Sequence, residues 1–395
     1  MSARRVLVYV QHLLGSGHLR RAALLSDAMT RAGMQVTLVS GGMPVPGLVA
    51  NVARFVQLPP VAAADLGFKS LVDEHGRAVD DAHKQARRDR LLALLHELRP
   101  HAVVIELFPF GRRQMRFELL PLLDAARASR PAPVIVSSVR DVLGGSRDAE
   151  RQLRMLAYFD QYFDHLLVHG DPALVRLDQT FAHVQGLGRR LHYTGYVVDR
   201  SFAVSPDPGV ELCGQDEVIV SAGGGAVGRG LLEAAIRARA LSVFAGLRWR
   251  VLVGAAMGTD ACAELQTLAR QYDAQGEGII VEPNRTDFSA LLRRCRLSIS
   301  QAGYNTVIET LQAGVRAVMV PFAGGSETEQ RLRARVLAEH AWIDIVEEPD
   351  LTPHSLAQAI NRVSRRARLR PGAVALDGAD ASARLIAEWT DGGPP

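Results

Sequence analysis

Short runs of valine, isoleucine and leucine alternate with longer segments of helical periodicity along nearly the whole chain of 395 residues. In the first half these runs lie near residues 5–10, 35–40, 54–58, 102–106, 133–137 and 165–169. In the second half they lie near residues 218–221, 249–253, 278–281, 296–300, 317–320 and 343–345. Continuous apolar runs separated by helices are typical of parallel strands that are buried on both faces of a sheet. The alternation therefore predicts an α/β fold made of βαβ units.

The alternation lapses between residues 187 and 209, where Ser205-Pro206-Asp207-Pro208-Gly209 has the composition of a linker. We therefore expect a first domain over residues 1–200 and a second over residues 201–372. The C-terminal segment, residues 373–395, contains a helical pattern that could pack back on the first domain. Two α/β domains that face each other leave a cleft, which is a common place for a ligand.

The composition excludes several classes of protein. The 46 lysines and arginines are nearly balanced by 42 acidic residues and are spread along the chain, so no nucleic-acid partner is expected. The three cysteines are isolated, which argues against disulfides and zinc and fits a reducing cytoplasm. No apolar run reaches the roughly 18 residues of a membrane span, and no signal peptide is evident. We expect a cytoplasmic protein with no transmembrane segment, and peripheral contact with the inner membrane face stays open.

The most informative motif joins the strand near residues 296–300 to a helix through a glycine. Backbone N–H groups and the positive dipole end at such a helix start attract phosphate. Glu309, a turn or so into the helix, could accept hydrogen bonds from a sugar diol. Phosphate and diol together suggest a nucleotide, and the candidate donor-binding residues are Gly303, Tyr304, Asn305, Thr306 and Glu309.

A glycine loop follows the strand near residues 218–221 and contains Gly223, Gly224, Gly225 and Gly228. Its spacing satisfies GxGxxG, so a dinucleotide-dependent oxidoreductase has to be considered. The acidic residue that such enzymes carry about 20 residues later is missing. We interpret the loop as a turn that approaches a phosphate, with a plain tight turn as the alternative.

Two further loops follow strands of the second half. Asn284 and Arg285 could contact the base of a nucleotide, and Asp287 is expected to cap the next helix. Glu329 and Gln330 start a later helix and could hydrogen-bond sugar hydroxyls. All of these residues are predicted at the carboxyl ends of parallel strands, where α/β folds bind ligands.

In the first half, Gly15 and Gly17 permit a tight turn that leads to His18 at the start of a helix. This histidine could act as a base, although a lone histidine is often only packed at such a position. The expected acceptor-side residues follow later strands and are Arg112, Arg113, Arg140 and Asp141. For these the alternative is ordinary surface charge.

Together these motifs resemble glycosyltransferase family 28, the group that contains the N-acetylglucosaminyltransferase forming lipid II. The resemblance is strongest from Val218 to about Ile345, and Gly15-Ser16-Gly17-His18 and Thr194-Gly195-Tyr196-Val197 give weaker support. In finer detail the chain resembles a bacterial branch of predicted glycosyltransferases, in which Phe108-Pro109-Phe110-Gly111-Arg112-Arg113-Gln114 recurs.

The resemblance implies a GT-B fold, in which two Rossmann-like domains face each other across a cleft and the second holds a nucleotide sugar. It implies that Glu309 holds the ribose, that the glycine turns approach the diphosphate, and that His18 serves the acceptor hydroxyl. It also assigns Glu329 and Gln330 to the donor sugar. Because Glu329 replaces an amide of the lipid II enzyme, the sugar need not be N-acetylglucosamine.

We therefore expect transfer of a hexosyl group from a nucleotide diphosphate sugar, with a UDP-sugar favoured, to an unidentified acceptor hydroxyl. A lipid-linked or cell-surface saccharide is open as the acceptor. No cofactor or metal is expected, because helix dipoles and N–H groups could stabilise the departing diphosphate. His18 or Asp141 is the expected general base. The alternatives are a nucleotide-sugar hydrolase or epimerase, and a non-catalytic nucleotide-sugar-binding protein.

Overall fold

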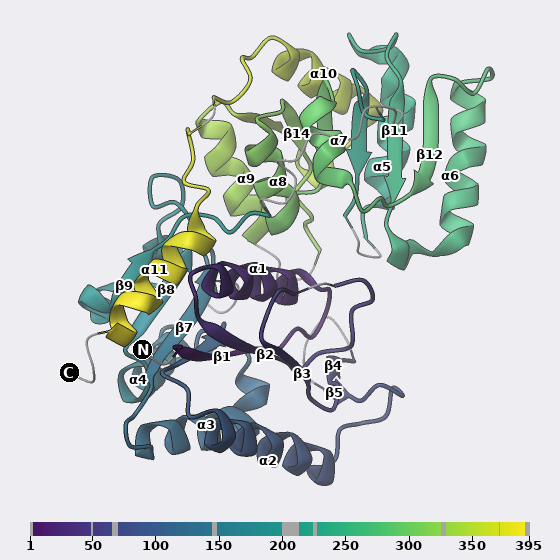
Figure 1. The fold of residues 1–395 in the computed structure, drawn as a ribbon. Coiled ribbons are helices and arrows are strands. Elements are labelled where there is room, and N and C mark those ends of the chain that lie inside the picture. Colours follow the sequence, from purple (N-terminus) through teal and green to yellow (C-terminus); the bar gives the residue numbers. More distant parts are fainter. Residues whose placement is uncertain are drawn as a thin grey trace. The chain divides into compact units, whose positions relative to one another are not determined.

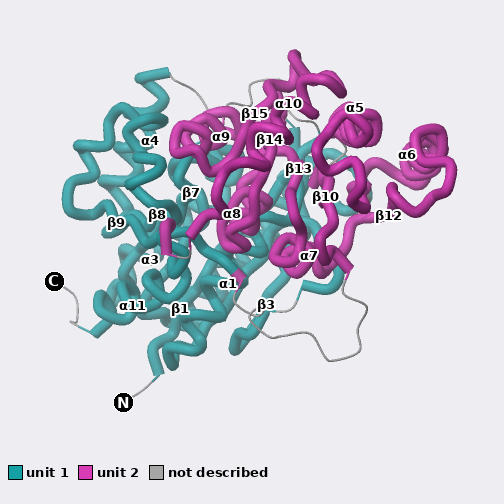
Figure 2. Tube along the Cα trace, turned by 90° about the horizontal axis from the view of Figure 1, so that it is seen from above, with its two compact units in different colours: residues 1–198, 375–395 teal, residues 199–374 magenta. Residues whose placement is uncertain are grey.

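The computed structural model describes residues 3–48, 50–64, 70–143, 148–199, 213–223, 227–324, 329–370 and 372–391. It divides into two compact units. Unit 1 holds residues 1–198 and 375–395, and unit 2 holds residues 199–374 (Figure 2). Each unit is built on its own parallel sheet, which confirms the predicted α/β class.

The main sheet of unit 1 has the strand order β3-β2-β1-β6-β7-β8-β9, and neighbouring strands are parallel throughout. Its strands are β1 (Arg5–Val10), β2 (Gln35–Ser40), β3 (Arg54–Gln57), β6 (Ala102–Glu106), β7 (Val134–Arg140), β8 (His165–His169) and β9 (Leu191–Tyr193). A separate antiparallel pair is formed by β4 (Ala62–Ala63) and β5 (Leu71–Val72).

Helices cover both faces of this sheet (Figure 1). They are α1 (Gly17–Arg31), α2 (Asp81–Leu98), α3 (Arg116–Ala128), α4 (Ala149–Tyr162) and the C-terminal α11 (Gly378–Asp391). Strand β1 shows how the faces are filled, because Val6 and Val8 join the core with α1 and α11 while Leu7 and Tyr9 join the core with α2, α3 and α4. This alternation follows from the two-residue period of a strand.

Strand β7 is longer than the sequence predicted, since it runs to Arg140 rather than ending at Ser137. Its polar residues stay in the ladder because neighbouring strands pair with them on both sides. Ser138 pairs with Glu106 of β6, and Arg140 pairs with His169 of β8. Arg140 is therefore a strand residue, not a loop residue.

The sheet of unit 2 has the order β12-β11-β10-β13-β14-β15 and is also parallel throughout. Its strands are β10 (Val218–Ser221), β11 (Trp249–Val253), β12 (Ile279–Pro283), β13 (Leu297–Ser300), β14 (Ala317–Met319) and β15 (Ile343–Ile345). Its helices are α5 (Arg229–Ala238), α6 (Gly258–Tyr272), α7 (Phe288–Arg294), α8 (Tyr304–Ala313), α9 (Glu329–Glu339) and α10 (Pro353–Ser364).

In both sheets the strand order reverses beside the first strand of the unit. The reversal lies between β1 and β6 in unit 1, and between β10 and β13 in unit 2. Doubly wound sheets bind ligands outside the carboxyl ends of the strands at such a reversal. The loops after these four strands are therefore the first places to look for a site. Within the part of the chain that the structure describes, no helix has the length and apolar character needed to cross a membrane.

Candidate functional site

His18 lies at the reversal point of unit 1, in the first turn of α1 directly after the loop from β1. Its Nδ1 atom is 2.8 Å from Oε1 of Glu106, the last residue of β6. Its Nε2 atom is 2.8 Å from a guanidinium nitrogen of Arg140 at the end of β7. The side chains of His18 and Glu106 are 11% and 2% exposed. Three elements thus bring these groups together in a nearly buried cluster.

The contacts fix the protonation of His18. A guanidinium group only donates hydrogen bonds, so Nε2 must accept the one from Arg140 with its lone pair. The ring proton then sits on Nδ1 and is donated to Glu106. Burial lowers the pKa of His18 to about 3, and the charges of Arg140 and Arg112 act in the same direction against Glu106. His18 is therefore a neutral imidazole whose Nε2 is its basic atom.

Glu106 also accepts a hydrogen bond from Arg21, which lies one turn after His18 on α1. Burial alone would raise the pKa of Glu106, but His18 and Arg21 hold it below its usual value. Glu106 is therefore a carboxylate that orients the histidine. Neither Glu106 nor Arg21 was among the predicted site residues. The signal that could have found Glu106 is a carboxylate at the end of an otherwise apolar strand, Ala102-Val103-Val104-Ile105-Glu106.

A fully buried network supports the loop before His18. Arg87 donates to both oxygens of Glu118 at 2.7 Å and to the side-chain oxygen of Gln11 at 2.7 Å, while Tyr9 donates to Glu118 as well. The side chains of Arg87 and Glu118 are 0% exposed. Since Gln11 is the first residue after β1, the network holds the start of the loop that leads to Gly15, which has a positive φ of 58°.

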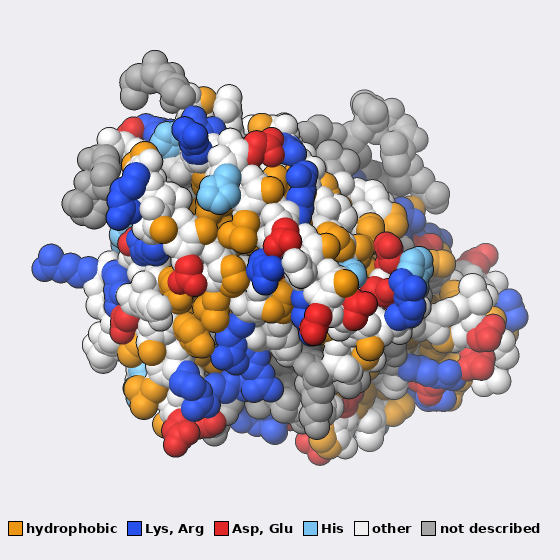
Figure 3. Space-filling model, turned by 90° about the horizontal axis from the view of Figure 1, so that it is seen from below, with side chains coloured by type: hydrophobic (Ala, Val, Ile, Leu, Met, Phe, Trp, Pro, Cys, Tyr) orange, Lys and Arg blue, Asp and Glu red, His pale blue; other side chains and the backbone are white. Residues whose placement is uncertain are grey.

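The two predicted acceptor-side arginines of the loop after β6, Arg112 and Arg113, lie in different surroundings. Arg112 has a left-handed backbone, with φ of 58°, and its Nε donates to the backbone oxygen of Gln11 at 2.6 Å. This brings its charge close enough to act on His18. Arg113 is exposed and lies in a separate pocket of about 100 Å³, lined by Phe108, Pro109, Gly111, Arg113, Arg116, Arg151, Arg154, Met155 and Tyr158. A gathering of basic and hydrophobic side chains is visible at the lower left of Figure 3.

Asp141, the second predicted base, is fully buried. Its Oδ2 accepts a hydrogen bond of 3.0 Å from the hydroxyl of Tyr196, and its Oδ1 accepts one of 2.9 Å from the backbone of Val142. The backbone of Gly170 leaves no room beside it, because an added Cβ there would lie 2.5 Å from Cβ of Asp141. These contacts suit a residue that fixes the end of β7 better than one that meets a substrate.

A second buried histidine, His169, was not predicted as a site residue. Its Nε2 lies 2.8 Å from Oγ of Ser138 and its Nδ1 lies 2.9 Å from Oγ1 of Thr194. Burial lowers its pKa to about 3, with a further contribution from Arg21 that Glu106 opposes. Both ring nitrogens are engaged, so His169 joins strands β7 and β8 as a neutral group.

In the described part of unit 2, glycines follow the two strands at the reversal point. Gly303 caps the start of α8, and Gly223 follows β10 with a positive φ of 75°. Among the atoms of the described residues, an added Cβ at either position would meet nothing within 4 Å. Gly228, with φ of 97°, is different, since an added Cβ would lie 2.7 Å from Cβ of Ala222. Gly224 and Gly225 lie outside the described residues.

The other predicted residues of α8 lie in three environments. Tyr304 is buried, and the guanidinium carbon of Arg333 lies 5.1 Å from the centre of its ring. Asn305 is exposed, while Thr306 and Glu309 are partly buried. Tyr304 thus packs inside unit 2, which leaves the other three as residues that a ligand at the start of α8 could contact.

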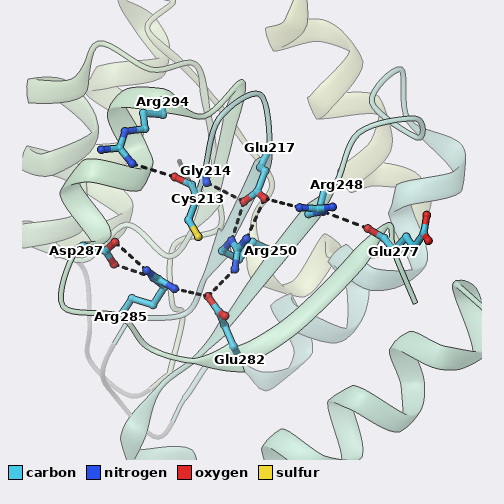
Figure 4. A network of polar contacts seen from close by, with 10 residues as sticks. All are labelled: Cys213, Gly214, Glu217, Arg248, Arg250, Glu277, Glu282, Arg285, Asp287 and Arg294. Carbon is cyan, nitrogen blue, oxygen red and sulfur yellow. Dashed lines mark hydrogen bonds and ion pairs between the residues drawn. The ribbon is translucent and has the colours of Figure 1, made fainter. Parts of the chain in front are cut away.

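Arg285 belongs to a network of ion pairs in unit 2 (Figure 4). It binds Asp287 through two contacts of 2.7 and 2.9 Å, and it lies 3.5 Å from Glu282, which also binds Arg250 at 2.9 Å. Asp287 occupies the N-cap position of α7, as expected, and its backbone oxygen accepts hydrogen bonds from Ala290 and Leu291, but its side chain makes no capping hydrogen bond. Its carboxylate is held by Arg285 instead. Asn284 is exposed beside this network.

Glu329 and Gln330 start α9, as the first two residues of the helix. The side-chain oxygen of Gln330 accepts a hydrogen bond of 3.2 Å from the backbone of Phe322, which follows β14. Both side chains are partly buried. Over the described ranges, no three His, Cys, Asp or Glu side chains are grouped as a metal site would require.

The chain is similar to known glycosyltransferases. Residues 235–376 match the glycosyltransferase family 28 C-terminal domain. A UDP-N-acetylglucosamine--N-acetylmuramyl-(pentapeptide) pyrophosphoryl-undecaprenol N-acetylglucosamine transferase of Granulibacter bethesdensis is 29% identical over 354 residues, which cover 87% of this chain and 82% of the relative. The transferase of the same name from Methylibium petroleiphilum is 30% identical over 182 residues, or 45% of this chain and 48% of the relative.

Solved structures share the fold. Acinetobacter baumannii MurG has a TM-score of 0.58 at 17% identity, with 98% of this chain and 99% of that chain covered. The glycotransferase of kitacinnamycin has a TM-score of 0.63 at 14% identity, with both chains fully covered. These findings confirm the resemblance to glycosyltransferase family 28 and the GT-B fold, and they identify the chain as a glycosyltransferase.

Proposed function

We propose that this glycosyltransferase moves a hexosyl group from a uridine diphosphate sugar to a hydroxyl of a lipid-linked saccharide, and that it does so without a metal ion. The observation that carries the proposal is the hydrogen bond between Nδ1 of His18 and the carboxylate of Glu106. Because Nδ1 faces the carboxylate, the basic Nε2 on the other side of the ring points away from it. The names of the relatives, which contain a UDP-sugar donor and a pyrophosphoryl-undecaprenol acceptor, support this choice of substrates.

In the proposed reaction, Nε2 of His18 takes the proton of the acceptor hydroxyl. The acceptor oxygen forms a bond to the anomeric carbon of the sugar while the bond from that carbon to the diphosphate oxygen breaks. Glu106 stabilises the imidazolium that forms, because its carboxylate is already hydrogen-bonded to the ring. His18 is favoured over Asp141 as the base, since both oxygens of Asp141 already accept hydrogen bonds inside the protein.

We infer that unit 2 holds the donor. Because no atom of the described residues lies within 4 Å of a Cβ added at Gly223 or Gly303, a diphosphate could approach the backbone N–H groups and the positive end of α8 there. Glu309 would accept hydrogen bonds from the ribose hydroxyls, and Glu329 and Gln330 would contact the sugar. The dipole and the N–H groups would stabilise the charge of the leaving diphosphate, which is why no metal is invoked.

Replacement of His18 by glutamine tests the proposal. With a UDP-sugar donor and saccharide acceptors, we expect the variant to lose about 100-fold or more in kcat while it binds UDP as the parent does. His96→Gln, at an exposed position of α2, is the matched control and should keep full activity. Wild-type activity in the His18 variant would remove His18 as the base, and loss of wild-type activity in excess EDTA would refute the metal-free mechanism.

Donor binding is tested separately by thermal shift. UDP is expected to stabilise the wild type more than Glu309→Ala, and equal shifts would exclude Glu309 from the ribose role. Rapid release of free sugar by the wild type without any acceptor would indicate a nucleotide-sugar hydrolase instead. Binding of UDP-sugars without turnover, whatever the acceptor, would indicate a sensor.

A further inference from the structure

The pocket that Arg113 lines in unit 1 combines positive charge with apolar surface. It has a volume of about 100 Å³ and lies between the loop after β6 and helix α4. The α4 residues that line it are three or four positions apart, so they form one stripe along the helix. Among the described residues that line the pocket, four are arginines and none is acidic: Arg113, Arg116, Arg151 and Arg154. The others, apart from Gly111, are apolar or aromatic: Phe108, Pro109, Met155 and Tyr158.

Arg151 is the arginine whose surroundings most favour an anion. Its side chain is partly buried, and it forms no ion pair with the residues that the structure describes. Burial lowers the pKa of Arg151, and the charges of Arg113 and Arg154 act in the same direction against the carboxylate of Asp148. Arg154 has a partner of its own, Glu150 at 3.4 Å. Since removing a cation from water costs free energy unless an anion lies close by, an anion in the pocket would stabilise Arg151.

Contacts within the pocket hold Arg116 in place. Its Nε donates to the backbone oxygen of Arg113 at 3.1 Å, and its guanidinium group donates to the hydroxyl of Tyr158 at 3.3 Å. The ring of Tyr158 lies 6.0 Å from the ring of Phe108, centre to centre. Phe108 and Pro109 are buried, whereas Arg113 and Arg116 are exposed. The buried part of the pocket is therefore apolar, and its exposed part is cationic.

We propose that this pocket binds the diphosphate group of the acceptor, with the first carbons of the attached apolar chain against Phe108 and Met155. Guanidinium groups bind phosphate oxygens through paired hydrogen bonds, and a diphosphate has enough oxygens and charge for several arginines. The apolar side chains add a contact that a free inorganic anion would not use. The inference rests on the proposed function and names the part of the acceptor that unit 1 recognises.

The loop after β6 connects the pocket with the surroundings of His18. Arg113 lines the pocket, and Arg112 directly before it donates to the backbone oxygen of Gln11 at 2.6 Å. Adjacent Cα atoms are only about 3.8 Å apart, so one short segment borders both the pocket and the loop that leads to His18. Helix α4 follows β7, so both walls of the pocket come after carboxyl ends of strands, as His18 does. An acceptor bound in the pocket would thus be held at the edge of the sheet that carries the proposed base.

The binding test uses geranyl diphosphate and inorganic pyrophosphate as probes, with saturating UDP to fill the proposed donor site. By titration calorimetry, we expect the double variant Arg113→Gln/Arg151→Gln to bind geranyl diphosphate about tenfold more weakly than the wild type. Met155→Gln should weaken the binding of geranyl diphosphate but not of pyrophosphate, because only the former has an apolar chain. Arg90→Gln, at an exposed position of α2, is the control and should bind as the wild type does. Equal affinities of the wild type and the double variant for geranyl diphosphate would overturn the pocket.

A transfer assay separates the acceptor from other sources of the same chemistry. With a UDP-sugar and a saccharide linked to geranyl diphosphate, and with no membrane present, the double variant should show a KM for the acceptor about tenfold higher and little change in kcat. Vesicles of phosphatidylglycerol are the second arm of the test. A double variant that loses binding to these vesicles but keeps the wild-type KM would assign the pocket to membrane headgroups and overturn the acceptor role. If the wild type binds geranyl diphosphate through the two arginines but transfers no sugar, the proposed function fails and the diphosphate pocket stands.

Discussion

At the reversal point of unit 1, charged side chains follow the strands and bind one another, whereas at the reversal point of unit 2 the strands are followed by Gly223 and Gly303, beside which an added Cβ would meet no atom of the described residues within 4 Å. The two sheets have the same kind of reversal in strand order. The difference therefore lies in what the loops carry. Charged side chains suit the movement of a proton, and bare backbone suits the close approach of a phosphate.

The largest expected effect concerns the buried network that supports the carboxyl edge of the sheet in unit 1. Arg87→Met should lower the free energy of unfolding by about 3–5 kcal/mol, because the fully buried carboxylate of Glu118 would lose its cation. Urea unfolding measures the loss. The control is Arg88→Met, whose partly exposed pair with Asp89 should contribute only about 0–1 kcal/mol. Equal losses in the two variants would mean that the edge of unit 1 does not depend on this network.

The next effect concerns the orientation of His18. Glu106→Gln keeps the shape of the side chain but removes the charge that stabilises an imidazolium, so kcat should fall about 100-fold with little change in KM. Glu97→Gln is the matched control, since Glu97 is exposed and pairs with Arg54 on the surface. A Glu106 variant with wild-type kcat would reduce the charged edge of unit 1 to a structural feature.

Sequence patterns predicted the fold well where strands are buried on both faces. The bounds of β1, β2, β6 and β8 agree with the predicted runs. Such a run is apolar over the length of strand that helices cover on both faces, so its ends mark the ends of the strand. The end of β7 was missed, since Ser138 and Arg140 are polar and their side-chain partners, His169 and His18, lie far away in the sequence. The short β9 was missed for a similar reason, because His192 and Tyr193 break the apolar pattern.

Part of the candidate site could also be predicted. Glycines and a histidine directly after strands mark the ends of strands at a sheet edge, so His18 and Gly303 could be located from local sequence. Glu106 and Arg21 could not, because the contact between His18 and Glu106 spans 88 positions of sequence and exists only since β1 pairs with β6. The burial of Arg21 could not be foreseen either, since its position on the helix is that of an ordinary surface arginine until its carboxylate partner is known. The roles of all predicted site residues remain predictions.

The pH dependence of stability separates the two units further. Burial lowers the pKa values of His18 and His169 to about 3 from an ordinary value of 6.5. Between pH 6.5 and 3 the unfolded chain therefore binds more protons than the folded one, so stability falls on acidification.

From pH 7 to pH 5, unit 1 should lose about 1–2 kcal/mol for each of these histidines, measured by urea unfolding at the two pH values. His169→Asn should be less stable than the wild type at pH 7 and should lose less on acidification. His96→Gln should keep the full pH dependence, because that position is exposed. A wild type equally stable at pH 5 and pH 7 would show that the two histidines are not buried as neutral groups.

The smallest expected effect probes the glycine edge of unit 2. At Gly303 the backbone has φ of −61° and a Cβ would meet no atom in the described part of the chain within 4 Å, so Gly303→Ala should fold and unfold as the wild type does. Its methyl group would nevertheless stand in the space through which a diphosphate reaches the start of α8. We expect the Kd for UDP to rise about tenfold, which corresponds to about 1.4 kcal/mol and can be measured by titration calorimetry.

Gly230→Ala in α5 is the control, because its Cβ also meets open space among the described residues and the added helix propensity should raise stability by up to about 1 kcal/mol without changing affinity. If Gly303→Ala bound UDP as tightly as Gly230→Ala, the bare edge of unit 2 would not be where the diphosphate lies, and the contrast between the two edges would lose its functional meaning.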